Sequence, residues 1–312
     1  MEIKKDKEQW AAFALLLVNL IYGASHVLAK GVMPVFLSPT VFILFRVIGA
    51  VILFWMLIPF VTRARILKRD LLRLAACGLF GVTINQLLFF HGLNASSPMN
   101  AGIIMALNPI MVAVLSFFWL KERLTITQWI GISIGAFGAI ALTAYGTKTM
   151  QAQLGDLFLL GNSLSYAVYL LLVKPLMQKY PPLVVITWVF TFGSLFLLAF
   201  PPLYVDLTQT NLQAIPWFIW VKIIYVVVGV TFLTYLLTVV GLKYVSSTVA
   251  SAFIYVQPIF VIAFSYLFVR MGWAADYTNQ ITTPKLVLMI VIFYGVHLTL
   301  GKRNFGNKTN PR

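Results

Sequence analysis

The chain has 312 residues, of which 61% are hydrophobic and 10% are charged, and its mean hydropathy is +0.92. Soluble domains contain about 25% charged residues, so this composition indicates a membrane protein. It excludes a disordered chain, a cytosolic enzyme and, with Cys77 as the single cysteine, a disulfide scaffold. The net charge of +15 lies mostly in short loops between apolar segments, where basic residues act as topology signals, so no nucleic-acid partner is implied.

Apolar segments long enough to cross a bilayer as helices, about 20 residues each, occur ten times along the chain. Two of the turns between them, at residues 94–97 and 241–245, are so short that the flanking segments must be antiparallel neighbours. The sequence therefore predicts an all-α polytopic membrane protein with ten transmembrane helices. The expected helices lie at residues 10–29, 39–60, 71–93, 98–119, 126–145, 154–173, 182–201, 217–239, 246–269 and 284–301.

The basic residues predict the orientation of these helices. With the N-terminus inside, 17 Lys and Arg side chains fall on the cytoplasmic side and five on the opposite side. Because Lys and Arg are retained in the cytoplasm, we expect both termini on the cytoplasmic face of the inner (plasma) membrane. The N-terminal segment leads into a full-length apolar run, so we interpret it as the first helix and not as a cleavable signal.

An internal repeat divides the chain into two halves. A shift of 149 positions aligns residues 92–116 with 241–265 and gives eight identities, among them Pro109 with Pro258, while Asn108 aligns with Gln257. Each unit then holds five helices, residues 1–150 and 151–312. Since five crossings reverse the side of the membrane, the two five-helix repeats are expected to be inverted.

Inverted repeats recur in secondary transporters, in which one half rocks against the other around a central site. Duplication retained only for packing is the alternative. A membrane-embedded lipid-handling protein or enzyme, or a passive receptor, also stays open. No HExxH, Walker A, nucleophile-elbow or cysteine-rich metal pattern appears, so we expect no enzyme, no cofactor and no metal site.

One stretch of the first half resembles a known family. Glu122-Arg-Leu-Thr-Ile-Thr-Gln-Trp-Ile-Gly131, followed by Gly135 and Gly138, is similar to the end of the fourth helix and the start of the fifth helix in EamA-type members of the drug/metabolite transporter superfamily. Tyr22-Gly23, Lys30, Arg46 and Pro109 also match. The resemblance implies a ten-helix transporter of small metabolites, often an exporter. The second half departs from the pattern, because Arg270-Met-Gly-Trp-Ala-Ala-Asp276 stands where a Glu-Arg equivalent would follow the ninth helix.

Polar side chains inside the expected helices are candidates for the work of the protein. They are costly in lipid and tend to face a cavity or another helix, so each is either a solute contact or a hydrogen bond between helices. Several share one helical face, spaced three or four residues apart. The candidate solute-binding residues are Asn19, Tyr22, His26, Asn85, Gln86, Asn108, Asn162, Tyr166, Tyr169, Tyr255 and Gln257.

Two prolines are candidate hinges. Pro109 and Pro258 each remove a backbone donor and free a carbonyl near mid-depth, which favours either a gating hinge or a purely structural kink. Lys30, Arg46 and Lys222 are expected to make an outer vestibule positive and to favour an anionic group such as a carboxylate. Alternatively, Arg46 extends its side chain to the headgroups.

Proton coupling has two candidate carriers, His26 and His91, because imidazole titrates near neutral pH. Both have an alternative role as uncharged hydrogen-bonding residues. No Asp or Glu is expected well inside a helix, and Asp156 is expected at a helix edge, so a carboxylate relay is poorly supported. We therefore expect a secondary transporter that moves a small organic solute, amino-acid-like and outward, by alternating access. Its expected partners are that small-molecule solute and the lipid bilayer.

Overall fold

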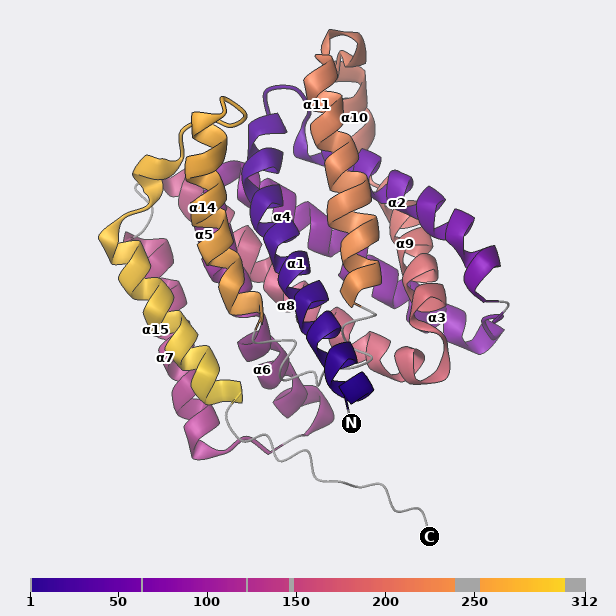
Figure 1. Ribbon diagram of the computed structural model, residues 1–312, viewed down its shortest axis with the longest axis horizontal. Helices are drawn as coiled ribbons and strands as arrows, with labels where there is room; N and C mark the ends of the chain where they lie inside the picture. Colours follow the sequence, from indigo (N-terminus) through magenta and orange to yellow (C-terminus); the bar gives the residue numbers. More distant parts are fainter. Residues whose placement is uncertain (1, 63, 122, 146–148, 239–252, 301–312) are drawn as a thin grey trace.

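The computed structural model describes residues 2–62, 64–121, 123–145, 149–238 and 253–300, apart from the side chains of residues 2–8, Tyr145 and Tyr255. Within these ranges the elements are all helical, and no strand occurs (Figure 1). Among the described residues, eight helices are long and apolar enough to cross a membrane, or up to nine if one bent pair counts as a single span. The prediction of an all-α polytopic membrane protein is confirmed at this level, and the count of ten stays a prediction.

The first half begins with two long helices and continues through several breaks. Ser38 and Ser97 cap two of these helices, since their hydroxyl oxygens accept from the backbone N–H groups of Val41 and Asn100, and a proline follows each cap. The elements are α1 (Glu2–Val32), α2 (Pro39–Val61), α3 (Lys68–Gly78), the π-helix η1 (Leu79–Thr83), α4 (Ile84–Ala95), α5 (Pro98–Met105), α6 (Asn108–Leu120) and α7 (Ile126–Tyr145).

The second half differs from expectation in two places. The predicted helix at 182–201 is three residues shorter, because α9 ends at Leu198, and α10 follows at an angle of 76° to it. Of the predicted helix at 246–269, residues 253–269 are described, and the turn at 241–245 lies outside the described residues. The elements are α8 (Met150–Lys179), α9 (Pro182–Leu198), α10 (Pro202–Gln209), η2 (Leu212–Ala214), α11 (Trp217–Ile224), the π-helix η3 (Tyr225–Leu233), η4 (Phe253–Val256), α14 (Gln257–Arg270), η5 (Thr278–Gln280) and α15 (Thr283–Leu300).

Contacts between the halves hold the bundle together: α1 packs on α14, α4 on α8 and α7 on α15. Glycines permit the closest of these approaches. A Cβ atom on Gly131 of α7 would lie 2.5 Å from the carbonyl oxygen of Gly295 in α15, and a Cβ atom on Gly23 of α1 would lie 2.5 Å from Cβ of Phe260 in α14. Any larger side chain at these positions would push the helices apart.

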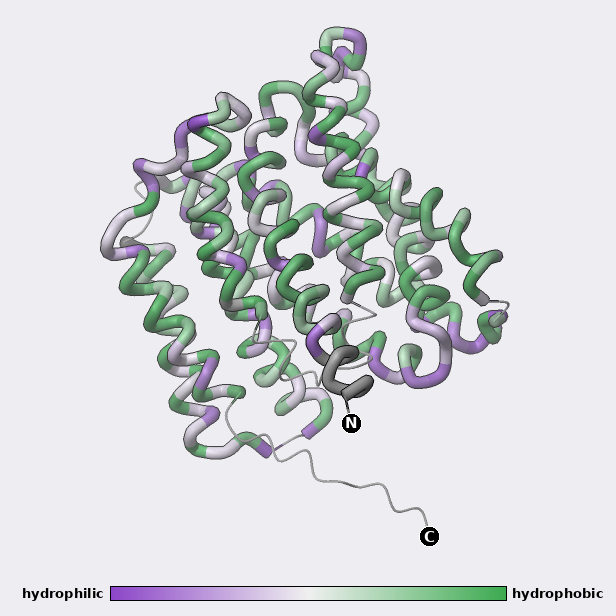
Figure 2. The backbone as a smooth tube through the Cα atoms, in the orientation of Figure 1, coloured by the Kyte–Doolittle hydropathy of each residue, from purple (hydrophilic) through white to green (hydrophobic). Residues whose placement is uncertain are grey.

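The outside of the bundle is apolar. Figure 2 shows hydrophobic residues along most of each helix, with hydrophilic residues gathered mainly at the helix ends and in the loops. Large side chains such as Phe60, Leu72, Ile126 and Trp217 are strongly exposed, whereas Phe54 and Phe90 are buried in the core. An exposed apolar surface of this extent is suited to lipid and not to water.

The helices that carry the two prolines begin at equivalent points. In the first half, α5 ends at Met105 and α6 begins at Asn108, directly before Pro109. In the second half, η4 ends at Val256 and α14 begins at Gln257, directly before Pro258. The two helix starts are 149 residues apart, the shift found in the sequence.

A π-helical turn interrupts the third predicted segment at η1. Its backbone carbonyl at Phe80 accepts a hydrogen bond of 2.6 Å from the Ser165 hydroxyl of α8, and the Thr83 hydroxyl donates to the carbonyl of Gly193 in α9. These two contacts join the irregular turn to α8 and α9. A second π-helix, η3, interrupts the eighth predicted segment, and its range overlaps that of η1 after the same shift of 149.

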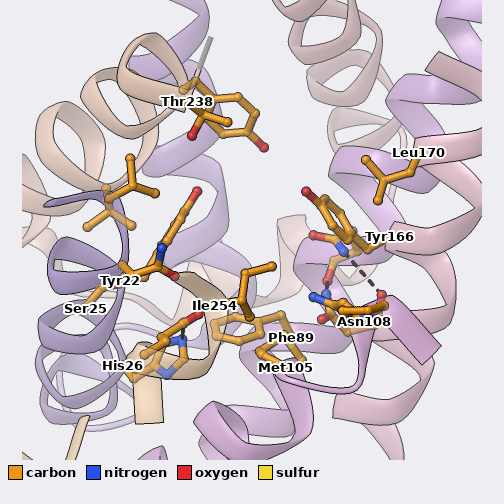
Figure 3. A pocket seen from close by; sticks show the side chains of 18 of the residues that line it. Tyr22, Ser25, His26, Phe89, Met105, Asn108, Tyr166, Leu170, Thr238 and Ile254 are labelled. Atoms are coloured by element: carbon orange, nitrogen blue, oxygen red, sulfur yellow. Dashed lines mark hydrogen bonds between the residues drawn. The ribbon is translucent and has the colours of Figure 1, made fainter. Parts of the chain in front are cut away.

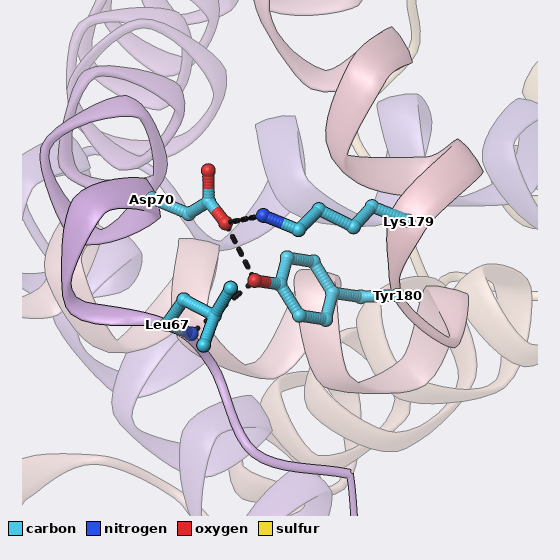
Figure 4. A network of polar contacts seen from close by, with 4 residues as sticks. All are labelled: Leu67, Asp70, Lys179 and Tyr180. Carbon is cyan, nitrogen blue, oxygen red and sulfur yellow. Dashed lines mark hydrogen bonds and ion pairs between the residues drawn. The ribbon is translucent and has the colours of Figure 1, made fainter.

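A polar network joins the start of α3 to the end of α8 (Figure 4). Asp70 forms an ion pair with Lys179 and accepts a hydrogen bond of 2.5 Å from the Tyr180 hydroxyl. The same hydroxyl accepts from the backbone N–H of Leu67 at 3.2 Å. Tyr180 thus ties the turn before α3 to α8.

Candidate functional site

A cavity of about 500 Å³ lies between helices of both halves, and its lining is mixed polar and aromatic. The close-up in Figure 3 shows Tyr22 of α1 and Tyr166 of α8 on opposite walls, with their hydroxyl groups directed into the space between the helices. The structure brings together nine of the eleven candidate solute-binding residues. Those that line the cavity are Asn19, Tyr22, His26, Asn85, Gln86, Asn108, Asn162, Tyr166 and Gln257.

Two candidates are placed differently. Tyr169 is absent from the cavity lining and is buried against the backbone of η1, where a Cβ atom on Gly81 would lie 2.4 Å from the tyrosine ring. Its ring packs on Tyr166 with a centroid distance of 5.8 Å. Tyr169 therefore supports the wall from behind. The side chain of Tyr255 lies outside the described part of the chain.

One face of α1 forms the first wall. Asn19, Tyr22 and His26 follow one another at helical spacing, as the sequence pattern predicts. The Asn19 amide donates to the carbonyl of Leu15 at 2.8 Å, and the Tyr22 hydroxyl lies 3.2 Å from the hydroxyl of Thr234. These contacts fix both side chains toward the cavity.

The opposite wall is built by a reciprocal pair of asparagines. The Asn162 amide donates to the carbonyl of Asn85 at 2.8 Å, and the Asn85 amide donates to the carbonyl of Asn162 at 3.3 Å. The pair clamps α4 to α8, which is the interhelical role that we kept open for such residues. Both side chains also line the cavity.

The polar atoms at the cavity are only partly paired with one another. One pair is the Gln257 amide nitrogen and Nε2 of His26, 3.2 Å apart. In the part of the chain that the structure describes, Nδ1 of His26, Oε1 of Gln86 and Oδ1 of Asn108 are buried without a hydrogen-bond partner. Buried polar atoms are normally paired, so these three atoms need a partner that the described residues do not supply.

Arg46 does not lie in an outer vestibule with Lys30 and Lys222, nor does it reach for the headgroups. It is 7% exposed and lines the cavity, with Nε donating to the Thr231 hydroxyl at 2.7 Å and Cζ 5.1 Å from the ring centroid of Phe90. Sequence position gave its depth in the second helix but not the direction of its long side chain.

The two lysines make separate contacts with backbone carbonyls. The Lys30 ammonium donates to the carbonyl of Asn94, and the Lys222 ammonium donates to the carbonyl of Trp273 at 2.6 Å. Neither lines the cavity. The expected positive vestibule of three residues is therefore not assembled around one space.

The remaining candidates divide between the cavity and other contacts. Pro109 lines the cavity, whereas Pro258 is buried at the start of α14 and is not part of the lining. His91 is also outside the lining, and its Nε2 atom lies 3.2 Å from the Thr40 hydroxyl. Of the two candidate proton carriers, the structure places His26 alone in the lining.

A buried carboxylate is the main feature that sequence reasoning missed. Asp156 is near the start of α8, as expected, but it is completely buried. Both of its oxygens accept from the Asn100 amide, at 3.1 and 2.9 Å, and Ser96 also donates to it. The position of Asp156 at a helix edge gave no sign of this enclosure, because the covering residues come from the turn between α4 and α5 and from the first turn of α5.

Other lining residues lie outside the set of eleven candidates. Phe89 and Leu170 are apolar and resemble ordinary helix residues, whereas Ser25 and Thr238 are small polar residues of the kind that also bond to their own helix. Among the described residues, no group of three or more His, Cys, Asp or Glu side chains is arranged to hold a metal ion. The lining thus offers hydrogen bonds, aromatic faces and one guanidinium.

The model of the EamA-like transporter family matches residues 9–144 and again residues 153–301. The chain belongs to the EamA-like transporter family. The match covers nearly the whole described bundle, and it includes every described residue of the cavity lining. The family is one of transporters and not of enzymes, which supports the view that the protein is not an enzyme.

Several proteins are similar to this EamA-like chain. The uncharacterized transporter YetK of Bacillus subtilis (strain 168) is 26% identical over 83% of this chain and 80% of its own. The uncharacterized transporter YyaM of the same organism is 26% identical over 64% of this chain and 66% of its own. A protein of Streptantibioticus cattleyicolor named a probable terminal-alkyne amino-acid exporter is 28% identical over 43% of this chain and 45% of its own.

A solved crystal structure shares the fold. Its TM-score is 0.57 with 17% sequence identity, and the match covers 92% of this chain and 96% of the other. At that identity the likeness concerns the arrangement of the helices alone.

Proposed function

We propose that the protein is a secondary transporter of the inner (plasma) membrane that moves a small organic solute through the cavity by alternating access. The observation that carries the proposal is the cavity itself: a space of about 500 Å³, lined by polar and aromatic groups from both halves, inside a bundle with an apolar exterior. Transporter sites commonly lie at the interface between repeats.

The two five-helix repeats, residues 1–150 and 151–312, remain part of this proposal, with ten crossings and both termini in the cytoplasm. Three observations support it. The family model matches each half separately, and α6 and α14 begin 149 residues apart, each one residue before a proline. In Figure 1, α1 begins on the same side of the bundle on which α15 ends, as an even number of crossings requires.

We propose an amino-acid-like solute and outward transport. The support is the name of one relative, the amino-acid exporter of Streptantibioticus cattleyicolor, together with the tyrosine and amide side chains that face the cavity. Pro109 and Pro258 are the proposed hinges. His26, which lines the cavity, is the proposed carrier if protons drive the cycle.

The test is flux of radiolabelled amino acids across sealed liposomes that contain the purified chain. Val112→Trp places a bulky ring in the cavity lining, whereas Val287→Trp makes the same change at an exposed site on α15. We expect saturable flux in the parent chain and in Val287→Trp, and a loss of about tenfold or more in Val112→Trp. Absence of solute-specific flux in folded protein across a broad metabolite panel, or equal flux in both variants, would refute the proposal.

A further inference from the structure

The cavity contains a positive charge whose surroundings are neutral. Arg46 lies in the wall contributed by α2, and its two described contacts are the hydroxyl of Thr231 and the ring of Phe90. A hydroxyl and an aromatic ring orient the guanidinium, but neither carries a compensating negative charge.

No carboxylate in the described part of the chain pairs with Arg46. The cavity lining contains no Asp or Glu among the described residues, and the ion pair found in that part joins Lys179 to Asp70 instead. The buried carboxylate of Asp156 is occupied by Ser96 and Asn100. A buried charge is costly without a partner, so an anion that enters the cavity gains more there than a neutral molecule of equal shape.

The chemistry of the guanidinium narrows the class of anion. Nε is engaged with Thr231, and the two terminal nitrogens keep four N–H donors in one plane. Such a planar fork matches the two oxygens of a carboxylate. Among the described residues the lining supplies one positive charge and no negative charge, so this part of the wall can balance one negative charge of a solute.

The rest of the lining fits a body that combines hydrogen-bond donors with apolar surface. Oε1 of Gln86 and Oδ1 of Asn108 are unpartnered acceptors, and the Tyr22 and Tyr166 rings supply aromatic surface. We propose that Arg46 is the residue that binds the carboxylate of the solute, and that the cavity selects carboxylates against their amide and cationic analogues. This inference rests on the proposed transport function and adds the chemical group that the site recognises.

The experiment compares acid and amide pairs as probes of the full-length purified chain, with the melting temperature in detergent as the readout. The pairs are phenylalanine with phenylalaninamide, leucine with leucinamide, and 3-phenylpropanoate with 3-phenylpropanamide. We expect at least one acid to raise the melting temperature, with an apparent affinity about tenfold or more above that of its amide. Chloride and inorganic phosphate serve as simple anions and should not reproduce the effect.

Variants then assign the preference to one side chain. Arg46→Gln should abolish the difference between acid and amide, and Arg46→Lys should retain part of it because the charge remains but the planar fork is lost. Arg270→Gln removes an exposed guanidinium outside the cavity and should leave the preference unchanged. If Arg46→Gln fails to fold, the acid and amide affinities of the parent chain still test whether the cavity prefers carboxylates.

Three outcomes would overturn the inference: no acid stabilises the parent chain, an amide or a simple anion does so equally well, or folded Arg46→Gln keeps the preference. The flux assay separates these outcomes from failure of the proposed function. Saturable transport of solutes that carry no carboxylate, with no transport of their carboxylate counterparts, would support a transporter but contradict the role of Arg46.

Discussion

The side-chain amide nitrogen of Gln257 lies 3.2 Å from Nε2 of His26 and thereby joins α14 to α1 at the cavity wall. With the amide in this orientation, its nitrogen donates and Nε2 of His26 accepts. The close approach of the two helices depends on Gly23, one turn before His26, which leaves room for Phe260. The histidine ring is thus held by a residue from the other half of the chain.

This contact predicts energetic coupling between the two residues. His26→Leu and Gln257→Leu should each lower the free energy of unfolding, and the double variant should lower it by less than their sum. The expected coupling energy is about 0.5–1 kcal/mol, the range of interhelical hydrogen bonds in membranes. Unfolding in mixed detergent micelles measures it, and strictly additive losses would show that the two side chains do not interact.

The asparagine clamp predicts an order of effects. Asn162→Leu removes the shorter bond, to the carbonyl of Asn85, and Asn85→Leu removes the longer one. We expect a loss of about 1 kcal/mol for Asn162→Leu and a smaller loss for Asn85→Leu, by the same unfolding measurement. Thr208→Val, at an exposed site, is the control. The reverse order would contradict the geometry.

The space around two glycines predicts different effects of alanine on stability: Gly131 lies at the tight contact between α7 and α15, and Gly31 lies in an open part of α1. Gly131→Ala would place a Cβ atom 2.5 Å from the carbonyl oxygen of Gly295, and it should cost about 2 kcal/mol or more. Gly31→Ala meets its nearest neighbour at 3.8 Å and should be neutral or slightly stabilising, since alanine favours a helix by about 1 kcal/mol. Equal melting temperatures for the two variants would show that the helices are not in close contact.

The network in Figure 4 predicts that Tyr180 contributes more to the free energy of unfolding than the ion pair does. Tyr180→Phe removes the hydroxyl that donates to Asp70 and accepts from the N–H of Leu67. The substitution should lower the free energy of unfolding by about 1 kcal/mol. Lys179→Gln removes the exposed ion pair and the contact of the ammonium with the Tyr180 ring, 5.1 Å away, and should have a smaller effect that fades as salt is added. Unfolding at low and high ionic strength checks both, and a larger loss for Lys179→Gln would contradict the prediction.

Helix type and most of the cavity could be predicted from the sequence, because both depend on local patterns. The helix expected at 126–145 is α7 with the same bounds, and the spacing of Asn19, Tyr22 and His26 correctly indicated one shared face. A polar side chain is costly to expose to lipid, so a polar residue within an apolar segment indicates the face of the helix that points into the bundle.

The failures concern features set by distant parts of the chain. Asp156 is buried because Ser96 and Asn100 cover it, and Arg46 turns into the cavity because Thr231 accepts its Nε–H group. Tyr169 has the same spacing as the cavity residues but packs behind Tyr166. The periodicity of a single helix cannot reveal these side-chain orientations, since each depends on which residue of another helix lies beside it.

The π-helical turn η1 also decides which side chains the next helix presents. A π turn takes up one residue more than an α turn, so every position after it is rotated by about 100° around the helix axis. Asn85 and Gln86 follow this turn and reach the cavity with that rotation included. If the same residues Leu79–Thr83 were wound as an α-helix, a different set of side chains would face inward although every amino acid of α4 stayed the same, whereas deletion of one of them with a return to α winding would leave the set unchanged. The identity of this wall is therefore encoded partly by the winding of the turn that precedes α4 and not by the chemistry of α4 alone.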